Sequence, residues 1–579
     1  MMDALRSWLL QPQPARRMKA SPSASWSRLK PLGPAPWYQG VNLFQLAIVL
    51  IAGAAHAASL AWPFALGSAL GLVQGQPAGW LQLLALALLA GQLDGARSWQ
   101  RGAWLGGLFA TTMLCATFWW LFISMHVYGG LAAPLAVLAV VLLAGFLGLY
   151  YAAAAGLFVF LAPVRPAPRA LVFAALWLLA ELARVKLFTG FPWGEGGYAH
   201  VDGWARALAP SVGVHGLTFL AAFLAGWLAF CLLAPRTLWL SAVAGVVLGL
   251  VLAWLPAPVT AEADPALSTP LSVTLLQGNI PQDEKFQAST GVSTALHWYG
   301  EQFLAARTSL VVAPETALPL LPQQLPEGYW PALQARFGTG EQAALVGVPL
   351  GSFDTGYSNS VVGFKPQPGS KPVSSATPEL FYRYDKHHLV PFGEVIPTGF
   401  RWFIDMMRIP LGDFNRGAVG QPSFDWQGQR LAPNICYEDL FGEELGARFA
   451  EPARAPTAFV NVSNIGWFGN TVAIDQHLQI SRMRALEFSR PMLRATNTGA
   501  TVIIDHRGEV THALARHTRG ALVGEVTGRS AITPYAWWVS RLGLWPLVAL
   551  SLAVVAAALS VRRQEARQAG RAPRARRVK

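Results

Sequence analysis

The stretch Asn434-Ile435-Cys436-Tyr437-Glu438-Asp439 places a cysteine just after a short mixed segment, 430–433, and directly before acidic residues. The chain has three cysteines, and the other two, Cys115 and Cys231, lie inside long apolar runs, where a thiol behaves as a small buried hydrophobic group. A thiol among charged and polar neighbours is instead a candidate nucleophile. Cys436 is therefore the residue around which the other features of the chain are interpreted.

The composition indicates a membrane protein. Of the 579 residues, 53% are hydrophobic, only 13% are charged and 23 are tryptophans, a balance unlike that of soluble domains. Much of the net charge of +13 sits in two tails, 16–30 and 562–579. Basic tails beside apolar segments set topology through the positive-inside rule, so the charge does not indicate a nucleic-acid partner. We expect no cleavable signal peptide and no disulfide framework.

Apolar runs of spanning length, or close to it, recur from Val41 to Leu255, and one more lies near the end of the chain. The second run is short and could borrow from 64–73, and the fourth is long enough to be tilted or to form two elements. The sequence predicts an α-helical membrane domain with about eight transmembrane helices, at 43–62, 80–93, 103–125, 131–161, 170–187, 216–234, 238–255 and 544–561.

The cations between these runs fall in alternate loops, and the longest of the opposite loops has only Arg206 well clear of the membrane ends. If the N-terminus is cytoplasmic, the loops around 74–76 and 126–129 face outward, and they carry no cation. Seven spans then place the region after Leu255 outside, and the last span returns the basic C-terminal tail to the cytoplasm. The cations that set this orientation are Arg97, Arg101, Arg165, Arg169 and Arg236. The outward loop 189–214, rich in glycine and aromatics, is either an interfacial aromatic belt or a ledge under the next domain.

From about Leu271 to Thr527 the pattern changes to short β-branched strands that alternate with helical stretches and turn signals. This is typical of an α/β domain. Strands are expected at 271–277, 310–313, 344–348, 360–364, 457–462 and 500–505, with a further short strand before Cys436. The predicted organisation is a basic cytoplasmic tail (1–40), a membrane domain of about seven helices (41–255), a linker (256–270), a catalytic domain (271–527), a connector with the last transmembrane helix (528–561), and a basic cytoplasmic tail (562–579).

Three side chains of the α/β domain could form a catalytic set, since each lies near the end of a predicted strand. Glu315 could take the thiol proton of Cys436 and later return it to a leaving group. Lys386 could lie beside a developing oxyanion and favour thiolate over thiol. The backbone N–H of Tyr437 could complete an oxyanion hole. We expect Glu315 to be partly desolvated, which would raise its pKa towards that of the proton it moves.

The sequence motifs around these three residues are more specific than the residues themselves. In combination they resemble the apolipoprotein N-acyltransferases, membrane-anchored members of the nitrilase superfamily, over about residues 45–560. The matching stretches are Gln277-Gly278-Asn279-Ile280-Pro281-Gln282, Ala313-Pro314-Glu315-Thr316-Ala317, 384–394, Ile435-Cys436-Tyr437-Glu438, 462–464, 467–469, 484–487, 490–491 and 494–499, with 126–130 and 190–193 in the membrane part.

The resemblance implies an αββα sandwich and a Glu-Lys-Cys triad. Glu315 would be the base, Lys386 would stabilise the tetrahedral intermediates, and Cys436 would be the nucleophile. Glu394, eight residues after Lys386, is similar to a family glutamate that supports the site. Tyr437 and Glu438 flank the thiol as they do in the family.

Two positions depart from the family pattern. Phe286 stands where a tryptophan is common, which keeps an aromatic ring but removes its N–H donor. Ile465 and Gly466 stand where an Asp-Ala pair is common, which puts a polar role there in doubt. The segment 400–409, which contains Trp402 and Phe403, is either a lid that dips into the membrane interface or a helix packed on the domain core.

The resemblance also implies the reaction. The thiolate would attack an acyl ester of a membrane glycerophospholipid, and the thioester would then acylate the N-terminal α-amine of a diacylglyceryl-cysteine apolipoprotein in a ping-pong sequence. No metal or cofactor is expected. The protein is expected to be a monomer. The predicted location is the bacterial inner membrane, multi-pass, with a periplasmic catalytic domain and both termini cytoplasmic. Two alternatives stay open: a membrane-tethered nitrilase-type amidase that hydrolyses small amides, and a non-catalytic membrane scaffold or transporter.

Overall fold

The computed structural model describes residues 43–232, 267, 269–366, 381–397, 399–405 and 413–571. Its catalytic half contains two six-stranded sheets with the orders β12-β1-β2-β3-β4-β5 and β11-β10-β9-β8-β7-β6. The first sheet comprises β1 (Leu271–Gln277), β2 (Leu310–Val312), β3 (Ala343–Ser352), β4 (Gly356–Phe364), β5 (Tyr382–Asp385) and β12 (Gly520–Val526). The second comprises β6 (Phe424–Trp426), β7 (Gln429–Ile435), β8 (Ala458–Ser463), β9 (Met492–Thr496), β10 (Val502–Ile504) and β11 (Val510–Ala513).

The two sheets have the same internal pattern. In each, three central strands run parallel, β1-β2-β3 and β7-β8-β9, and the outer strands pair antiparallel to them. Parallel strands need both faces covered, and these strands are accordingly buried almost throughout. The carboxyl ends of β2 and β7 therefore become the places where polar loop residues can emerge from the core.

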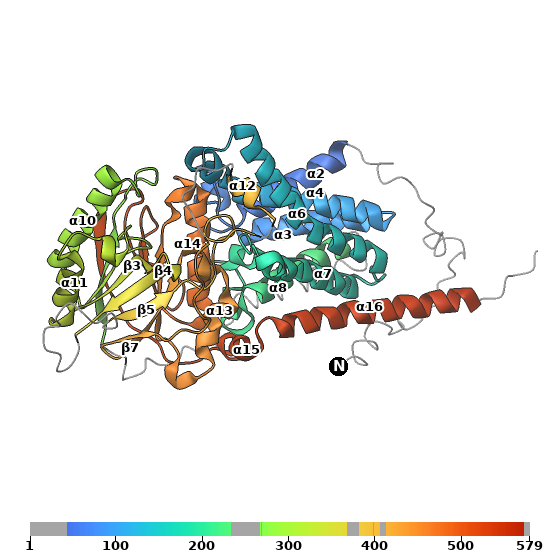
Figure 1. Ribbon diagram of the computed structural model, residues 1–579. Coiled ribbons are helices and arrows are strands. Elements are labelled where there is room, and N and C mark those ends of the chain that lie inside the picture. The colour runs from blue at the N-terminus through green and yellow to red at the C-terminus, as the bar shows by residue number, and fades with distance from the viewer. Residues whose placement is uncertain are drawn as a thin grey trace, which may run out of the picture.

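The sheets face each other and carry helices on their outer faces. Apolar side chains of both sheets, among them Val273, Leu345 and Val460, form one buried cluster between them. A second cluster joins the first sheet to helices α10 (Ser293–Ala305) and α11 (Tyr329–Gly338). The second sheet packs against α14 (Val472–Phe488), on the side that meets the membrane helices (Figure 1). The predicted αββα sandwich is therefore the observed fold of the catalytic half.

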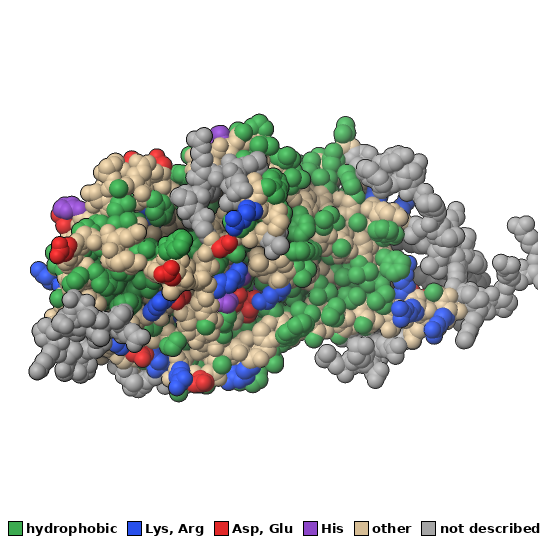
Figure 2. Space-filling model, in the orientation of Figure 1, with side chains coloured by type: hydrophobic (Ala, Val, Ile, Leu, Met, Phe, Trp, Pro, Cys, Tyr) green, Lys and Arg blue, Asp and Glu red, His purple; other side chains and the backbone are tan. Residues whose placement is uncertain are grey.

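The other half is helical. Its elements are α2 (Leu43–Ala58), α3 (Gly79–Asp94), α4 (Trp99–Phe118), α5 (Leu121–Ile123), η3 (Ser124–Tyr128), α6 (Ala133–Leu161), α7 (Pro166–Lys186) and α8 (Ala209–Leu232), with α16 (Trp545–Arg571) from the end of the chain. Shorter helices of the catalytic half include η9 (Ala288–Val292), α12 (Arg401–Asp405), η11 (Cys436–Leu440), α13 (Gly442–Gly446), η14 (Ile465–Phe468) and α15 (Pro534–Leu542). Hydrophobic side chains cover much of the helical half, and most of the visible charged ones gather over the catalytic half (Figure 2).

Length and composition qualify only some of these helices as membrane spans. Within the described residues, three helices pass, at Ala133–Leu161, Arg206–Leu232 and Trp545–Gln568, and the bent pair Trp99–Phe118 and Leu121–Tyr128 would give a fourth. Helices α2 and α3 are apolar but have only 16 residues each. The predicted span at 238–255 lies outside the described residues. The count of about eight therefore stays a prediction.

Small residues let two of the membrane helices approach closely. A Cβ atom on Gly106 of α4 would lie 2.3 Å from the Cβ of Ala155 on α6, and one on Gly148 of α6 would lie 2.7 Å from Oγ1 of Thr111. Side chains at these positions would force the helices apart. In lipid, helices gain no hydrophobic free energy by exchanging contacts with acyl chains for contacts with one another. They therefore often associate through close backbone approach at small residues.

The two halves meet through a buried polar contact. Oε1 of Gln476, on α14, accepts hydrogen bonds from the indole Nε1 of Trp120 at 3.1 Å and of Trp193 at 2.8 Å. Its amide nitrogen donates to the carbonyl of Thr117 at 3.0 Å. Trp193 belongs to the loop 189–214, and it is buried rather than exposed to lipid. This part of the loop is therefore a ledge under the catalytic domain, not an interfacial belt.

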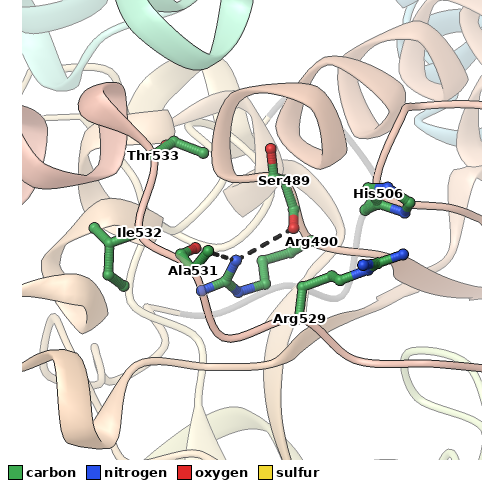
Figure 3. Close-up of a pocket in the computed structure, with 7 residues that line it drawn as sticks. All are labelled: Ser489, Arg490, His506, Arg529, Ala531, Ile532 and Thr533. Carbon is green, nitrogen blue, oxygen red and sulfur yellow. Dashed lines mark hydrogen bonds between the residues drawn. The ribbon is translucent and has the colours of Figure 1, made fainter. Parts of the chain in front are cut away.

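A second link joins the catalytic half to the C-terminal anchor. Arg490, which is fully buried, follows the end of α14 and donates to the carbonyls of Ser489 at 3.2 Å and Ala531 at 2.7 Å (Figure 3). Its Nε donates to the carbonyl of Pro456 at 2.6 Å, just before β8. One guanidinium thus ties the second sheet to the connector that leads into α15 and α16.

The basic loops lie together at the far end of the helical half. Arg169, at the start of α7, forms an ion pair of 2.5 Å with Asp94, at the end of α3. Arg562 of α16 lies over the ring of Phe160, close to the end of α6, at 3.8 Å from its centroid. The catalytic domain packs at the opposite end, against Trp120 (Figure 1).

Candidate active site

Cys436 lies at the end of β7, where the chain turns into η11. Its φ angle is +53°, in a region that non-glycine residues rarely adopt. Such a conformation is sparsely populated and is typically retained at functional positions. The carbonyl of Cys436 accepts a hydrogen bond of 3.2 Å from Nδ2 of Asn461, which helps to hold the turn. The thiol is half-buried, beside the rim of the sandwich.

A buried ammonium lies between two carboxylates at the same rim. Nζ of Lys386, 1% exposed, lies 3.3 Å from Oε1 of Glu315 and 2.8 Å from Oε2 of Glu394. Glu315 follows β2, and Lys386 directly follows β5. The structure therefore brings together the three carboxylate and lysine side chains that the sequence singled out, and the charges of all three act on the Cys436 thiol.

An asparagine connects the two carboxylates. Nδ2 of Asn359, on β4, donates to Oε1 of Glu315 at 2.8 Å and to Oε1 of Glu394 at 2.7 Å. The other oxygen of Glu315 accepts a hydrogen bond of 2.8 Å from the backbone N–H of Asn464. Both oxygens of Glu315 are thus oriented by neutral donors as well as by Lys386, which fixes the rotamer of the candidate base.

The proton distribution of the resting site follows from burial and charge. Burial raises the pKa of the Cys436 thiol to about 12; the Glu315 carboxylate adds to the rise and the Lys386 ammonium opposes it. Burial alone would raise the pKa of Glu315, but the Lys386 ammonium and the Asn359 amide hold it below its ordinary value. The expected rise in the pKa of Glu315 is therefore not found. The resting pair is a thiol and an ionised carboxylate, and Lys386 keeps its proton because the carboxylates outweigh its burial.

Glu438 organises the loop around the nucleophile. Its Oε2 accepts hydrogen bonds of 2.7 Å from both the backbone N–H of Ile435 and the hydroxyl of Tyr384, and its Oε1 accepts one of 2.6 Å from the backbone N–H of His387. This carboxylate joins the residue before Cys436 to the residue after Lys386. Its contacts are those of a group that positions the site.

Tyr437 connects the site to the membrane half. Its hydroxyl donates to the carbonyl of Gly190 at 3.3 Å, and its ring stacks on Phe191 with a centroid distance of 6.3 Å. Its backbone N–H lies directly after the nucleophile in the chain, where the sequence analysis predicted an oxyanion donor. That role stays a prediction.

Three aromatic side chains belong to the predicted site, Phe286 at a family tryptophan position and Trp402 and Phe403 in the candidate lid segment. Phe286 is 47% exposed, Trp402 is 60% exposed, and Phe403 is half-buried against the ring of Phe392 at 5.5 Å. Exposure of Trp402 favours the lid interpretation of this segment over a helix packed on the core, although residues 406–412 lie outside the described part of the chain. Ile465 is fully buried in the apolar core, so it has no polar role.

Sequence reasoning missed three polar residues of this site. Asn359 comes directly before the predicted strand 360–364, Asn464 lies inside a matching stretch, and Lys285 directly precedes Phe286. The one sequence signal for Lys285 is its place directly before Phe286, just after the matching stretch that begins at Gln277. Within the described residues, no group of three or more His, Cys, Asp and Glu is placed to hold a metal ion.

Comparison with known families agrees with this architecture. A family model described as carbon-nitrogen hydrolase matches residues 368–534, which include Lys386 and Cys436. Together with the two sheets between helical layers, this match defines the catalytic half as a nitrilase-type domain. A second model, described as apolipoprotein N-acyltransferase N-terminal domain, matches residues 66–227 in the helical half.

Whole-chain relatives carry both halves. An apolipoprotein N-acyltransferase of Verminephrobacter eiseniae is 58% identical over 525 residues, which cover 86% of this chain and 94% of that protein. One of Ralstonia nicotianae is 46% identical over 84% of this chain and 90% of its own, and one of Bordetella bronchiseptica is 41% identical over 92% and 99%. The chain belongs to the apolipoprotein N-acyltransferase family.

Proposed function

We propose that this enzyme transfers a fatty acyl chain from a membrane glycerophospholipid to the N-terminal α-amine of a diacylglyceryl-cysteine apolipoprotein, through a thioester on Cys436. The observation that carries the proposal is the thiol beside a buried lysine and two carboxylates, at the rim of a domain packed on apolar helices. Both proposed substrates carry acyl chains, so a site beside membrane helices suits them. The proposal needs no metal or cofactor.

The first half-reaction uses the resting proton distribution. As Cys436 Sγ attacks the ester carbonyl, Glu315 takes the thiol proton. This transfer is needed because the Cys436 thiol, with a pKa of about 12, is neutral at rest, and a neutral thiol is a poor nucleophile. Negative charge passes to the carbonyl oxygen, which the Lys386 ammonium stabilises. The tetrahedral intermediate then collapses, the C–O bond of the ester breaks, and Glu315 returns the proton to the departing lysophospholipid oxygen.

The second half-reaction repeats these roles with an amine. The α-amine of the acceptor attacks the thioester carbonyl, Glu315 takes a proton from the nitrogen, and Lys386 again lies beside the oxyanion. Breaking of the C–S bond releases an amide, and the Cys436 sulfur recovers its proton from Glu315. A thioester is more reactive towards amines than the oxygen ester it replaces, so one difficult step becomes two easier ones.

Intact mass spectrometry of the purified protein tests this sequence. After incubation with phospholipid vesicles, the protein should gain one acyl mass, which a diacylglyceryl-cysteine peptide should then remove as the peptide gains it. Cys436→Ala should gain no acyl mass, and Cys231→Ala, a second buried cysteine, should behave as wild type. Acyl-enzyme that decays to free fatty acid regardless of peptide would support the hydrolase alternative. No adduct on a folded wild-type protein would contradict acyl transfer.

We also propose a bacterial inner-membrane location with the catalytic domain periplasmic, both termini cytoplasmic and a monomeric state, with domains divided as the sequence predicts. The arginine-rich end of the helical half, near Arg169, lies opposite the catalytic domain, which fits the positive-inside rule. A cysteine introduced by Phe353→Cys, at a 92% exposed side chain, should react with a membrane-impermeant maleimide in intact spheroplasts. One introduced in the C-terminal tail should react only after lysis.

A further inference from the structure

The loop after β1 turns a lysine inward and its aromatic neighbour outward. Lys285 is 2% exposed, whereas Phe286 is 47% exposed. Hydrophobicity alone predicts the reverse, because lysine is among the residues least often buried. Backbone hydrogen bonds close the loop on both sides of Lys285, from Glu284 to Pro281 at 3.2 Å and from Gln287 to Glu284 at 2.7 Å. These bonds fix the main chain on both sides of a lysine that lies in the interior.

The loop has no room to rearrange. A Cβ atom on Gly291, in η9, would lie 2.1 Å from the carbonyl oxygen of Glu284 and 2.8 Å from Cα of Lys285. Only glycine fits against the backbone at this point. The main chain at Lys285 is thus packed directly against η9, beside the buried side chain.

The buried ammonium is aimed at the base of the proposed triad. Its Nζ donates to the backbone carbonyl of Glu315 at 3.2 Å, the one hydrogen bond that it makes within the described residues. An ammonium has three donors, so a single carbonyl leaves two unused. Burial of an ion costs several kcal/mol unless an opposite charge offsets it. The charge that acts on Lys285 in the resting site is that of Glu315, and Cys436 adds to it only once the thiol has lost its proton.

The charge balance of the site depends on this lysine. With a neutral thiol, Glu315 and Glu394 contribute two negative charges, and Lys386 and Lys285 contribute two positive ones. Without Lys285 the resting site would carry one net negative charge. Because Glu315 becomes neutral as it takes the thiol proton, the negative charge moves to Cys436 and then to a carbonyl oxygen without changing the net charge, and a second buried cation offsets it in each of these states.

We infer that Lys285 is a second active-site cation: it positions the main chain of Glu315 and offsets the carboxylate charge, so that negative charge can pass to Cys436 and to the tetrahedral oxyanion. Burial lowers the pKa of this lysine to about 8, against the opposing pull of Glu315 and Cys436, so the charge is present at neutral pH. The inference rests on the proposed role of Cys436 as nucleophile and adds a residue that touches neither thiol nor substrate.

Thiol alkylation measures this effect without any lipid substrate. The rate of iodoacetamide modification of Cys436 would be followed on the full-length protein in micelles from about pH 7 to about pH 10, with peptide mapping, because Cys115 and Cys231 are also free. Removal of a nearby positive charge raises the thiol pKa. At a pH below that pKa, each unit of increase lowers the thiolate fraction, and with it the alkylation rate, tenfold. Lys285→Met should therefore slow alkylation at pH 7 by about tenfold or more, and phospholipid acylation likewise.

Two further variants separate charge from structure. Lys285→Arg keeps the charge and should alkylate within about threefold of wild type at neutral pH. Lys365→Met, at a half-buried lysine that donates to the carbonyl of Asp425 and lies far from the thiol in the chain, should change neither rate. A folded Lys285→Met protein with a wild-type alkylation profile would overturn the inference, whatever its melting temperature. If Lys285→Met does not fold, a folded Lys285→Arg protein decides: alkylation near the wild-type rate supports the role, and a tenfold loss overturns it.

The two proposals fail separately. If wild type forms no acyl-enzyme from vesicles, the acyl-transfer function fails, but the alkylation profiles still report whether Lys285 acts on the thiol. If acyl-enzyme forms and the Lys285→Met profile is unchanged, only the role of Lys285 fails.

Discussion

Nδ2 of Asn359 lies 2.8 Å from Oε1 of Glu315 and donates a hydrogen bond to it. The same nitrogen donates to Glu394 at 2.7 Å, so a single neutral side chain bridges the two carboxylates that hold Lys386. The amide therefore orients both carboxylates towards the one ammonium that they share.

Asn359→Leu should disable the site without removing a triad member. Hydrogen bonds to charged groups contribute about 1.5–3 kcal/mol each, so loss of the donor should slow acyl-enzyme formation roughly 10- to 100-fold. Intact-mass kinetics with phospholipid vesicles measure this. Asn415→Ala, which removes an exposed asparagine that donates to the carbonyl of Thr355, is the matched control and should act as wild type. A rate within threefold of wild type would show that the bridge is dispensable.

Glu315→Gln should move two properties of Cys436 in opposite directions. The Glu315 charge helps to raise the pKa of the thiol to about 12, so its removal should lower that pKa and speed alkylation at a given pH below it, by about tenfold per unit. Acyl-enzyme formation should nevertheless fall by about 100-fold or more, because no base remains to take the proton. Alkylation and intact-mass rates on the same sample test this. Parallel changes in both rates would contradict the role of Glu315 as base.

Trp402→Ala should weaken the use of lipid substrate and leave the chemistry intact. Trp402 is 60% exposed and lies far along the chain from Cys436 in a lid-like segment. If the indole enters the membrane interface, its loss removes about 1 kcal/mol of apolar burial and raises KM for vesicle phospholipid roughly fivefold. Steady-state kinetics should show kcat and the alkylation profile unchanged. A fall in kcat with constant KM would instead place Trp402 in the chemical step.

Gln476→Leu should loosen the junction between the two halves. Both Trp120 and Trp193 would lose their buried acceptor, at a cost of about 1–3 kcal/mol for each unsatisfied donor. The melting temperature should fall by several degrees, and the alkylation profile of Cys436 below that temperature should stay unchanged. Gln323→Leu, at an exposed glutamine that donates to the carbonyl of Gly351, is the control for the substitution itself. An unchanged melting temperature would mean that the junction is held elsewhere.

The strands predicted from sequence are those with several apolar or β-branched residues in succession. The segment 271–277 matches β1, and the other predicted segments overlap β2, β3, β4, β8 and β10. Strands β5, β6, β9, β11 and β12 were not predicted, and β7 only as a short strand. β9 contains Arg494, and β7 contains Pro433 and Asn434, which are poor strand signals in isolation.

Tertiary partners explain why those polar residues can lie in buried strands. Nη1 of Arg494 lies 3.4 Å from Oδ2 of Asp439 and 2.5 Å from Oγ of Ser481, so its charge is compensated inside the core. Oδ1 of Asn434 accepts a hydrogen bond of 2.6 Å from Nδ2 of Asn461 on the neighbouring strand. Neither partner is near in sequence, so no local pattern could reveal the pairing.

The sequence by itself determined the kind of chemistry and the kind of environment. Three features were enough to predict a nitrilase-type domain on a helical membrane domain. They are one cysteine outside the apolar runs, the matching motifs around Glu315 and Lys386, and the composition. These features are local, because a reactive side chain and its flanking residues lie in one continuous stretch of the chain.

Only the tertiary structure decided how the charges are arranged. Glu315 and Lys386 are 71 positions apart, and Asn359 and Lys285 reach the same rim from other elements. Whether a carboxylate is ionised, a thiol neutral or a lysine buried depends on distances across the fold and on exclusion of water. Distances and the exclusion of water are set only when the sheets pack, so the sequence singled out Cys436 as the candidate nucleophile and the fold revealed Lys285 beside the candidate base.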